Sequence, residues 1–261
     1  MDLGLTGKHV LITGGTRGIG LACARLYLEE GARVSICGRS TATCDAALRQ
    51  LDAGDRVDAH VADVTDPAAV LRLIDEVEAR KGPVDVLVNS AGAAARRPFA
   101  ELDSVAWHAA MEAKFHTYVN VIDVVIKRMA ERKSGAVVNV VGMGGKFPTI
   151  THIAGGSANA ALMLATAGLA SAYARYGVRV NAVNPTLTAT ERMKSGMEAD
   201  ARQEGISVEE AGRRAAARMP LQRIATPEEV ADVVVYLSSA RASYVSGSII
   251  NVDGASSPAV V

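Results

Sequence analysis

Short apolar runs rich in valine and isoleucine alternate along the chain with longer segments of helical periodicity. Most of the short runs are apolar at successive positions, as expected of strands buried on both faces of a sheet. Such strands, separated by helices, predict a parallel sheet with helices on each side. The seven predicted strands are His9–Thr13, Arg33–Cys37, Val57–Val61, Val84–Asn89, Ala136–Val141, Val178–Asn184 and Ser248–Val252.

Helix signals fill the intervals between these strands. A helix is predicted over Pro67–Lys81, because Asp66 suits the N-cap, proline suits the first turn and Gly82 suits the C-cap. The alternation of strand and helix from end to end predicts one doubly wound α/β domain over residues 1–261. Two further helices are predicted over Ile19–Glu30, before Gly31, and over Pro227–Ser239, after Thr226.

Two segments depart from this alternation. Thr188–Met219 is long, charged and alanine-rich, and we expect one or two amphipathic helices that form a lid over a substrate site. Phe147–Ala174 contains no Asp, Glu, Lys or Arg and exceeds the roughly 20 residues that cross a bilayer. Its Ala, Gly, Ser, Thr and Asn residues gain little from lipid, so a helix packed closely on another helix is expected instead of a membrane span.

Composition narrows the class of protein. Apolar residues make up 49% of the 261 residues and charged residues 21%, which allows a sizeable core and excludes wholesale disorder. The net charge is zero, so no broad electrostatic surface for nucleic acid is expected. Three cysteines are too few for a disulfide scaffold, and their spacing matches no zinc site. The first ten residues contain no apolar run. This feature and the few cysteines together favour the cytoplasm as the compartment.

A glycine-rich loop follows the first predicted strand. Glycines allow a tight turn there and let the backbone approach a pyrophosphate, which the N-terminus of the next helix attracts. This arrangement predicts a dinucleotide site. Its residues are Thr13, Gly14, Gly15, Thr16, Arg17, Gly18, Ile19 and Gly20.

The end of the second strand indicates which nicotinamide cofactor binds. An acidic residue there would bind the ribose 2′-hydroxyl of NAD(H), but the strand ends Cys37-Gly38-Arg39-Ser40. Arg39 offers a forked donor to a 2′-phosphate, and Arg17 is near enough in the loop to assist. The sequence therefore predicts NADP(H).

The sequence resembles the short-chain dehydrogenase/reductase family over nearly its whole length. The motifs that carry the resemblance are Thr13–Gly20, Asp63-Val64, Asn89-Ser90-Ala91-Gly92, Asn184-Pro185 with Thr190, and Val252-Asp253-Gly254. Ser90 stands where the family has a second Asn, and Thr186 where it usually has Gly. The resemblance implies a Rossmann-type fold, a homo-oligomer (dimer or tetramer) and cofactor contacts from Asp63, Val64, Asn89, Ala91, Gly92, Pro185, Thr188 and Thr190.

The family's catalytic residues do not appear at the matching positions. The family uses a serine, a Tyr-x-x-x-Lys motif and an asparagine from the preceding long helix. Here Gly142 takes the place of the serine, Gly155 of the tyrosine, Asn159 of the lysine and Lys114 of the asparagine. Because all four positions change while the cofactor loop is kept, a rebuilt active site is the favoured interpretation.

Lys114 and Tyr118 are four residues apart, so they share a helix face. A charged Lys114 would lower the pKa of Tyr118, and a desolvated Lys114 would itself exchange protons near neutrality. His152 lies near the pocket by the family pattern and titrates near physiological pH, whereas His116 is expected to face away from Lys114. Asn159 is expected to bond a ribose hydroxyl of the cofactor.

These residues predict an atypical NADP(H)-dependent reductase or dehydrogenase acting on a carbonyl or alcohol. A lyase or isomerase on the same scaffold and a non-catalytic nucleotide-binding subunit, including a decayed enzyme, remain open alternatives. Arg96 and Arg97, after the fourth strand, and arginines of the lid are candidate contacts for an anionic small-molecule substrate, or else solvated charges. No metal cluster is expected. The lid arginines are Arg213, Arg214 and Arg218, with Glu209 and Glu210 beside them.

Overall fold

Seven parallel strands form one sheet in the order β3-β2-β1-β4-β5-β6-β7. The structure is a computed structural model that describes residues 2–92, 94–97, 99–191, 193, 197, 198, 201 and 205–257. The predicted strands are confirmed, with small shifts at their ends. They are β1 (His9–Thr13), β2 (Arg33–Gly38), β3 (Val57–Val61), β4 (Val86–Asn89), β5 (Gly135–Val140), β6 (Val178–Pro185) and β7 (Ile249–Val252).

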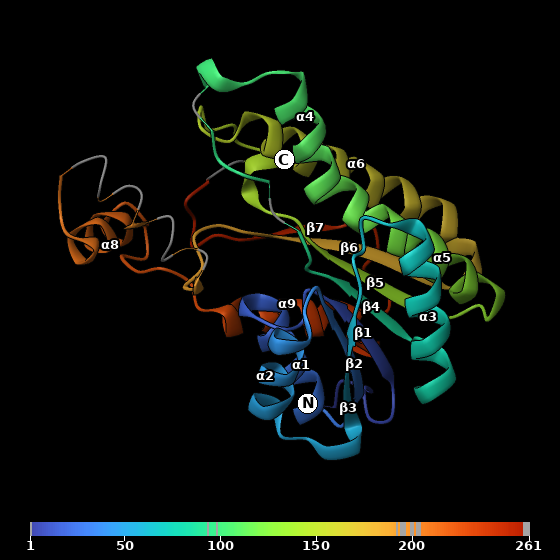
Figure 1. Cartoon of the computed structure of the whole chain (residues 1–261). Helices are drawn as coiled ribbons and strands as arrows, with labels where there is room; N and C mark the ends of the chain where they lie inside the picture. Colours follow the sequence, from blue (N-terminus) through green and yellow to red (C-terminus); the bar gives the residue numbers. More distant parts are fainter. Residues whose placement is uncertain are drawn as a thin grey trace.

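Helices cover both faces of the sheet. Figure 1 shows α1, α2 and α9 on one side and α3, α5 and α6 on the other, and the two main hydrophobic clusters lie between these layers and the strands. The α/β expectation is therefore confirmed. The helices are α1 (Gly18–Glu29), α2 (Thr41–Leu51), α3 (Pro67–Lys81), α4 (Ser104–Met111), α5 (Thr117–Glu131), α6 (Ile153–Tyr173), α8 (Val208–Ala217) and α9 (Pro227–Ser238).

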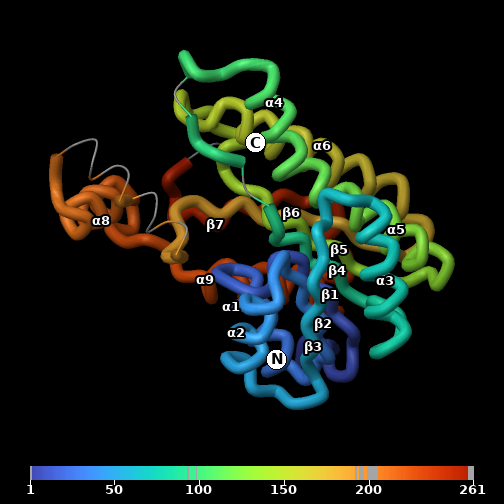
Figure 2. Tube along the Cα trace, in the orientation of Figure 1, coloured from blue at the N-terminus to red at the C-terminus, as the bar shows by residue number. Residues whose placement is uncertain are grey.

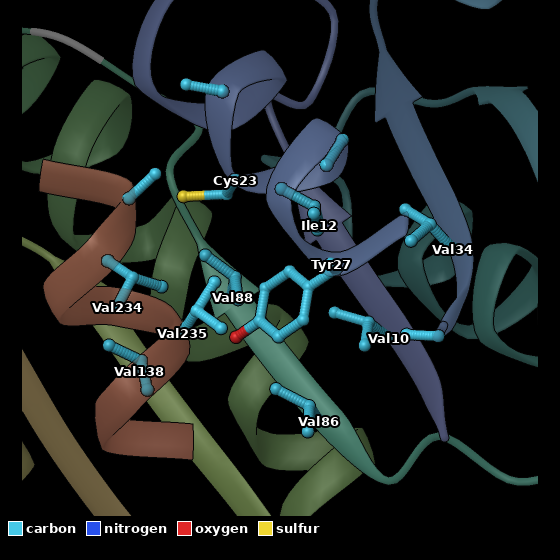
Figure 3. Close-up of a cluster of buried hydrophobic side chains, with 14 of the residues drawn as sticks. Val10, Ile12, Cys23, Tyr27, Val34, Val86, Val88, Val138, Val234 and Val235 are labelled. Carbon is cyan, nitrogen blue, oxygen red and sulfur yellow. The ribbon is translucent and has the colours of Figure 1, made fainter. Parts of the chain in front are cut away.

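Tyr27 anchors the core on the α1 and α9 side. Its ring is fully buried, and Figure 3 shows it reaching from α1 toward α9 among strand valines. Its hydroxyl is 2.7 Å from the hydroxyl of Ser238. This contact satisfies the polar end of a large buried aromatic residue and fastens α9 to α1.

A line of buried polar side chains crosses the centre of the sheet. The amide of Asn89 on β4 donates to Asn139 Oδ1 on β5 over 3.0 Å, and Asn139 donates to Thr166 Oγ1 of α6 over 3.0 Å. All three side chains are almost completely buried. Because unsatisfied polar groups are costly in a core, this line fixes β4, β5 and α6 relative to one another beneath the carboxyl ends of the strands.

The long apolar helix α6 packs against the protein core. By length and composition alone, the stretch Ile153–Tyr176 is the one candidate for a membrane span among the described residues, and half of its most apolar window is buried inside the protein. Part of the rest is exposed, with Leu164 at 77%. A buried core helix passes the same test of length and composition.

The predicted lid coincides with the part of the chain that lies farthest from the sheet. Both Figures 1 and 2 show α8 at the left, away from the strands. Ala211 and Ala215 of α8 form a small separate cluster with Met197 and Ala201. Residues 192, 194–196, 199, 200 and 202–204 of the predicted lid lie outside the described residues, so the lid stays a prediction.

A buried histidine lies at the opposite end of β1 from the glycine loop. His9 has no exposed surface, and its ring nitrogens lie 2.7 Å from the Gly82 carbonyl and 2.9 Å from Ser35 Oγ. Burial lowers the pKa of His9 below its ordinary value, although the hydrogen bond to Gly82 acts against this. The nearby Asp58 has a lowered pKa as well, since its contacts with His60 and Ser35 and the positive charge of Lys81 together outweigh its burial.

We expect the free energy of unfolding to decrease as the pH falls below about 6.5, the ordinary His pKa. Below that pH the histidine at position 9 binds a proton in the unfolded chain, whereas buried His9 of the folded chain resists protonation. This difference lowers the free energy of unfolding by up to about 1.4 kcal/mol per pH unit. Asp58 contributes only below its own ordinary value of 3.8, so it adds nothing above about pH 5, and the His9→Asn variant separates His9 from the other histidines. Urea unfolding of wild type and His9→Asn measures this, and the variant should lose much of the slope. His108→Gln, at an exposed histidine, should keep it; an equal slope in all three proteins would contradict the assignment.

Candidate functional site

The glycine loop forms a cradle at the carboxyl end of β1, where the strand order reverses. Gly14 and Gly18 have positive φ angles of 66° and 52°, which glycine adopts without strain. A Cβ on Gly20 would lie 2.3 Å from the Gly14 carbonyl oxygen, so the helix approaches the loop too closely for any side chain. Helix α1 starts with no side-chain cap and no acidic residue in its first turn. Its free N–H groups therefore suit a pyrophosphate.

The two predicted phosphate-reading arginines flank this cradle. A Cβ on Gly38 would lie 2.7 Å from Thr16 Cγ2, so the loop after β2 touches the loop after β1. Arg39 follows Gly38 and is exposed. Its charge adds to the hydrogen bonds from Thr65 that hold the pKa of Asp63 below its ordinary value. Arg17 is also exposed and lies 4.0 Å from Glu191.

The remaining predicted cofactor residues line the same edge of the sheet. A Cβ on Gly14 would lie 2.8 Å from the Ala91 backbone, and a Cβ on Gly18 would lie 3.1 Å from Thr190 Cγ2. Thr188 is buried and pairs in a short bridge with Ala225. The positions of the others are as follows: Ile19 in the first turn of α1, Val64 buried after β3, Asn89 buried at the end of β4, Gly92 just beyond it, and Pro185 at the end of β6.

Lys114 is the most unusual residue of the site, because its side chain is only 7% exposed. Its ammonium donates to Tyr118 Oη over 2.7 Å and to the Val140 carbonyl over 3.0 Å. It also lies 4.4 Å from the centre of the Tyr118 ring. The Tyr118 hydroxyl in turn donates to the same Val140 carbonyl. The predicted contact between Lys114 and Tyr118 is therefore present.

A π-helical turn over Glu112–His116 carries Lys114 between α4 and α5. Such turns are rare and often occur at functional sites. The turn fits against Gly92, because a Cβ there would lie 2.2 Å from the Ala113 carbonyl oxygen. His116 is exposed, as expected for a residue that faces away from Lys114.

A small chamber of about 70 Å³ brings the predicted catalytic residues together. Lys114, His152 and Asn159 all line it. Tyr118 does not line it; this fully buried side chain lies behind Lys114 and holds it. The other lining residues are Gly92, Ala94, Val141 and Gly155.

Two positions at the chamber suit only glycine, one because of its backbone and the other because of its neighbours. At Gly142, φ is 125°, a conformation that disfavours any residue with a Cβ. The Gly142 N–H donates to Asn184 Oδ1 over 3.2 Å, which holds the loop there. A Cβ on Gly155 would lie 2.1 Å from His152 Cε1 and 2.8 Å from Ala94 Cβ. The imidazole of His152 therefore fills the space that a side chain at position 155 would need.

Asn159 places a buried polar atom in the wall of the chamber. It is 5% exposed, and its Oδ1 has no hydrogen-bond partner among the described residues. A buried amide oxygen of this kind is costly unless a ligand satisfies it. The glycine cradle and this oxygen both fit a bound dinucleotide, with Asn159 placed to accept from a ribose hydroxyl.

A second, larger cavity of about 170 Å³ adjoins the chamber at His152. Arg97 lines it, and Arg96 does not. Six of its eleven lining residues are alanines, three of them on α4 and one in the first turn of α6. Within the described ranges, no group of three or more His, Cys, Asp or Glu residues is arranged to hold a metal ion.

Sequence reasoning missed two polar groups that position the site. The Val140 carbonyl ends β5 and receives both Lys114 and Tyr118, and a backbone acceptor leaves no signal in a sequence. Asn184, which binds the Gly142 N–H, was assigned only to a family motif. An asparagine at a buried position of a valine-rich strand signals an amide with a specific partner, and the sequence carries that signal at position 184.

Comparison with known proteins identifies the scaffold. The sequence profile described as short chain dehydrogenase matches residues 8–201. The chain belongs to the short chain dehydrogenase family. The cis-4-hydroxycyclohexanecarboxylate dehydrogenase of Sinomonas cyclohexanicum is 37% identical to it over 248 residues, which is 95% of each chain.

Two solved short chain dehydrogenase structures are also similar. An actinorhodin polyketide ketoreductase with NADPH has a TM-score of 0.93 and 34% identity, covering 97% of this chain and 98% of its own. An NADPH-bound short chain oxidoreductase of Pseudomonas aeruginosa PAO1, described as containing an atypical catalytic center, has a TM-score of 0.89 and 30% identity, covering 98% and 99%. The prediction of NADP(H) as the cofactor is confirmed by such neighbours.

We expect Arg39→Gln to weaken NADPH binding about 10- to 150-fold, the value of a hydrogen bond to a charged group. NADH binding should stay unchanged, because NADH has no 2′-phosphate. Calorimetric titration of both nucleotides measures the two effects. Arg49→Gln, at an exposed arginine in the last turn of α2, serves as the control; equal losses for NADPH and NADH would contradict the role of Arg39.

Proposed function

We propose that the chain is an NADP(H)-dependent oxidoreductase that reduces a carbonyl or oxidises an alcohol, with Lys114 as its proton donor. The observation that carries the proposal is the buried ammonium of Lys114 in the wall of the chamber that His152 and Asn159 also line. Most lysines remain in water, and a buried lysine at a cavity is a frequent mark of a functional site.

The cofactor residues set the geometry of the reaction. The glycine cradle and the N-terminus of α1 would hold the pyrophosphate, Arg39 and Arg17 the 2′-phosphate, and Asn159 a ribose hydroxyl. When bound, NADPH supplies the hydride that forms the new C–H bond. The chain's own residues must then provide one proton to the carbonyl oxygen for each turnover.

Lys114 supports this proton transfer through its position. Its ammonium lines the chamber in which the substrate oxygen would lie, and Tyr118 and the Val140 carbonyl hold it there. In reduction, the proton passes from Lys114 Nζ to the substrate oxygen and leaves a neutral amine. His152 is half-buried at the boundary of the chamber, so it returns a proton from solvent to Lys114. Oxidation runs through the same steps in reverse.

Tyr118 is a positioning residue in this proposal. Its hydroxyl and Lys114 share the Val140 carbonyl, which holds the flexible lysine stem in one orientation. Tyr118→Phe keeps the ring and removes both the acceptor for Lys114 and the donor to the Val140 carbonyl. We expect Tyr118→Phe to shift the pH profile of kcat and to change KM little. A purely structural role would not produce this combination.

We expect Lys114→Met to lower kcat about 10²- to 10⁴-fold, the usual value of a positioned acid. NADPH affinity should change by less than about threefold, under 1 kcal/mol, and the fold should persist because methionine suits a buried site. The ketone corresponding to the hydroxy acid named for the Sinomonas relative is a suitable first substrate in a carbonyl panel.

The matched control for this measurement is Lys127→Met, at an exposed lysine of α5 paired with Asp123. Its kcat should equal that of wild type. If Lys114→Met retains wild-type kcat on an accepted substrate, Lys114 is not the proton donor.

The mutual fit of Gly155 and His152 favours a rebuilt site over a decayed one. Decay would leave empty space where a side chain was lost. Here the His152 ring occupies that space, and Gly142 has a backbone conformation that suits glycine. The glycines at positions 142 and 155 therefore each match the structure around them.

Gly155→Ala should reduce kcat at least about tenfold, since its Cβ forces the His152 ring out of place and misplacement of a catalytic group is costly. Gly168→Ala on the same helix is the control, because a Cβ there meets nothing within 4 Å. It should keep full activity and unfold at equal or higher temperature. Unchanged kinetics in Gly155→Ala would contradict a role for His152.

We also propose a homo-oligomer in the cytoplasm. Helix α6 exposes Leu164 among small uncharged residues, a surface that a second copy would cover. The three cysteines are free and buried, and burial raises the pKa of Cys23 and Cys37 to about 12. Unpaired, unreactive thiols are typical of proteins in a reducing compartment.

A further inference from the structure

The larger cavity beside the chamber has walls of an unusual kind. It lies between α4, the loop after β4 and the first turn of α6, and just over half of its lining residues are alanines. Ala106, Ala110 and Ala154 are buried there. A wall of alanines leaves open the volume that larger side chains would fill, and it offers a ligand only apolar contacts. His152 lines both this cavity and the chamber, so the two spaces meet at its ring.

The size of the cavity limits what it can hold. Its volume of about 170 Å³ is close to the roughly 150 Å³ of an apolar protein cavity that binds benzene. A ring or branched chain of about six carbons therefore fits. A sugar or nucleoside would bring several hydroxyl groups against alanine methyl groups, at the cost of their hydration.

One cation stands at the edge of this apolar space. Among the described residues, Arg97 is the only permanently charged one that lines the cavity, and no carboxylate lines it. Its guanidinium has no ion pair with any part of the chain that the structure describes. The Arg97 N–H donates to the Thr151 carbonyl over 2.9 Å, which ties the two loops together and fixes where the side chain starts. A guanidinium binds a carboxylate through two parallel hydrogen bonds.

We infer that the alanine-lined cavity is the specificity pocket of the enzyme and that Arg97 reads a carboxylate on the substrate. The substrate class is a compact apolar keto acid or hydroxy acid of about six ring or chain carbons, with its carboxylate remote from the reacting carbon. The reacting carbon lies in the chamber beside Lys114 and His152, and the apolar body extends past His152 into the cavity. This inference rests on the proposed function for its reaction, but not for its binding.

Steady-state kinetics with a matched pair of substrates test the inference. 4-Oxocyclohexanecarboxylate and its carboxamide have the same ring and differ in charge. Arg97→Met keeps an unbranched apolar stem and removes the charged guanidinium. We expect its KM for the carboxylate to rise about 10- to 100-fold, with kcat unchanged and with no change for the carboxamide. Arg96→Met is the neighbouring control and should leave both KM values at their wild-type levels.

Binding without turnover separates this inference from the proposed function. Calorimetric titration of the NADPH complex with cyclohexanecarboxylate measures the pocket alone. Arg97-dependent binding in a protein that converts no carbonyl would support the pocket and contradict the proposed function. Conversion of carbonyl compounds with no preference for the carboxylate, or equal losses for both substrates in Arg97→Met, would overturn the role of Arg97. Ala110→Leu fills the cavity and should prevent cyclohexanecarboxylate binding while the NADPH affinity is kept; retained binding would overturn the location of the pocket.

Discussion

The burial of the Lys114 ammonium is the constraint on which the rest of the site depends. A charged group removed from water needs acceptors inside the protein. The Val140 carbonyl provides one, because β5 ends there and its last carbonyl is turned toward the helix. Tyr118 provides the second. The π-helical turn then presents the lysine to the chamber, and Gly92 gives that turn room to approach the strand ends.

The surrounding small residues follow from the same constraint. His152 occupies the space above Gly155, and Gly142 has a positive φ that suits no larger residue. A tyrosine at 155 or a serine at 142 would disturb the present arrangement. The glycines at these two positions are therefore part of the same arrangement as Lys114. Asn159 keeps at the chamber an amide oxygen that no described residue satisfies, and in the proposed function it accepts from a ribose hydroxyl. The glycine cradle, at the carboxyl end of β1, contains none of these positions.

The fold and the cofactor site were predictable from sequence because local chemistry determines them. Runs of valine specify buried parallel strands, and Asp66 or Thr226 start helices by hydrogen bonds to nearby backbone. The pairing of Lys114 with Tyr118 followed from helical spacing alone. The shared Val140 carbonyl, the ring of His152 above Gly155 and the selection of Arg97 over Arg96 were not predictable. Each depends on how distant segments meet, and no local pattern records that.

Deuterium transfer is the measurement that tests most directly whether this chain uses its cofactor for redox chemistry at the Lys114 chamber. NADPH labelled with deuterium at C4 on either face would be incubated with the protein and a ketone that it converts. The account predicts one deuterium on the carbinol carbon for each turnover, from one face of the nicotinamide only. Conversion of the substrate with all of the label left in the nucleotide would contradict it and would favour lyase or isomerase chemistry.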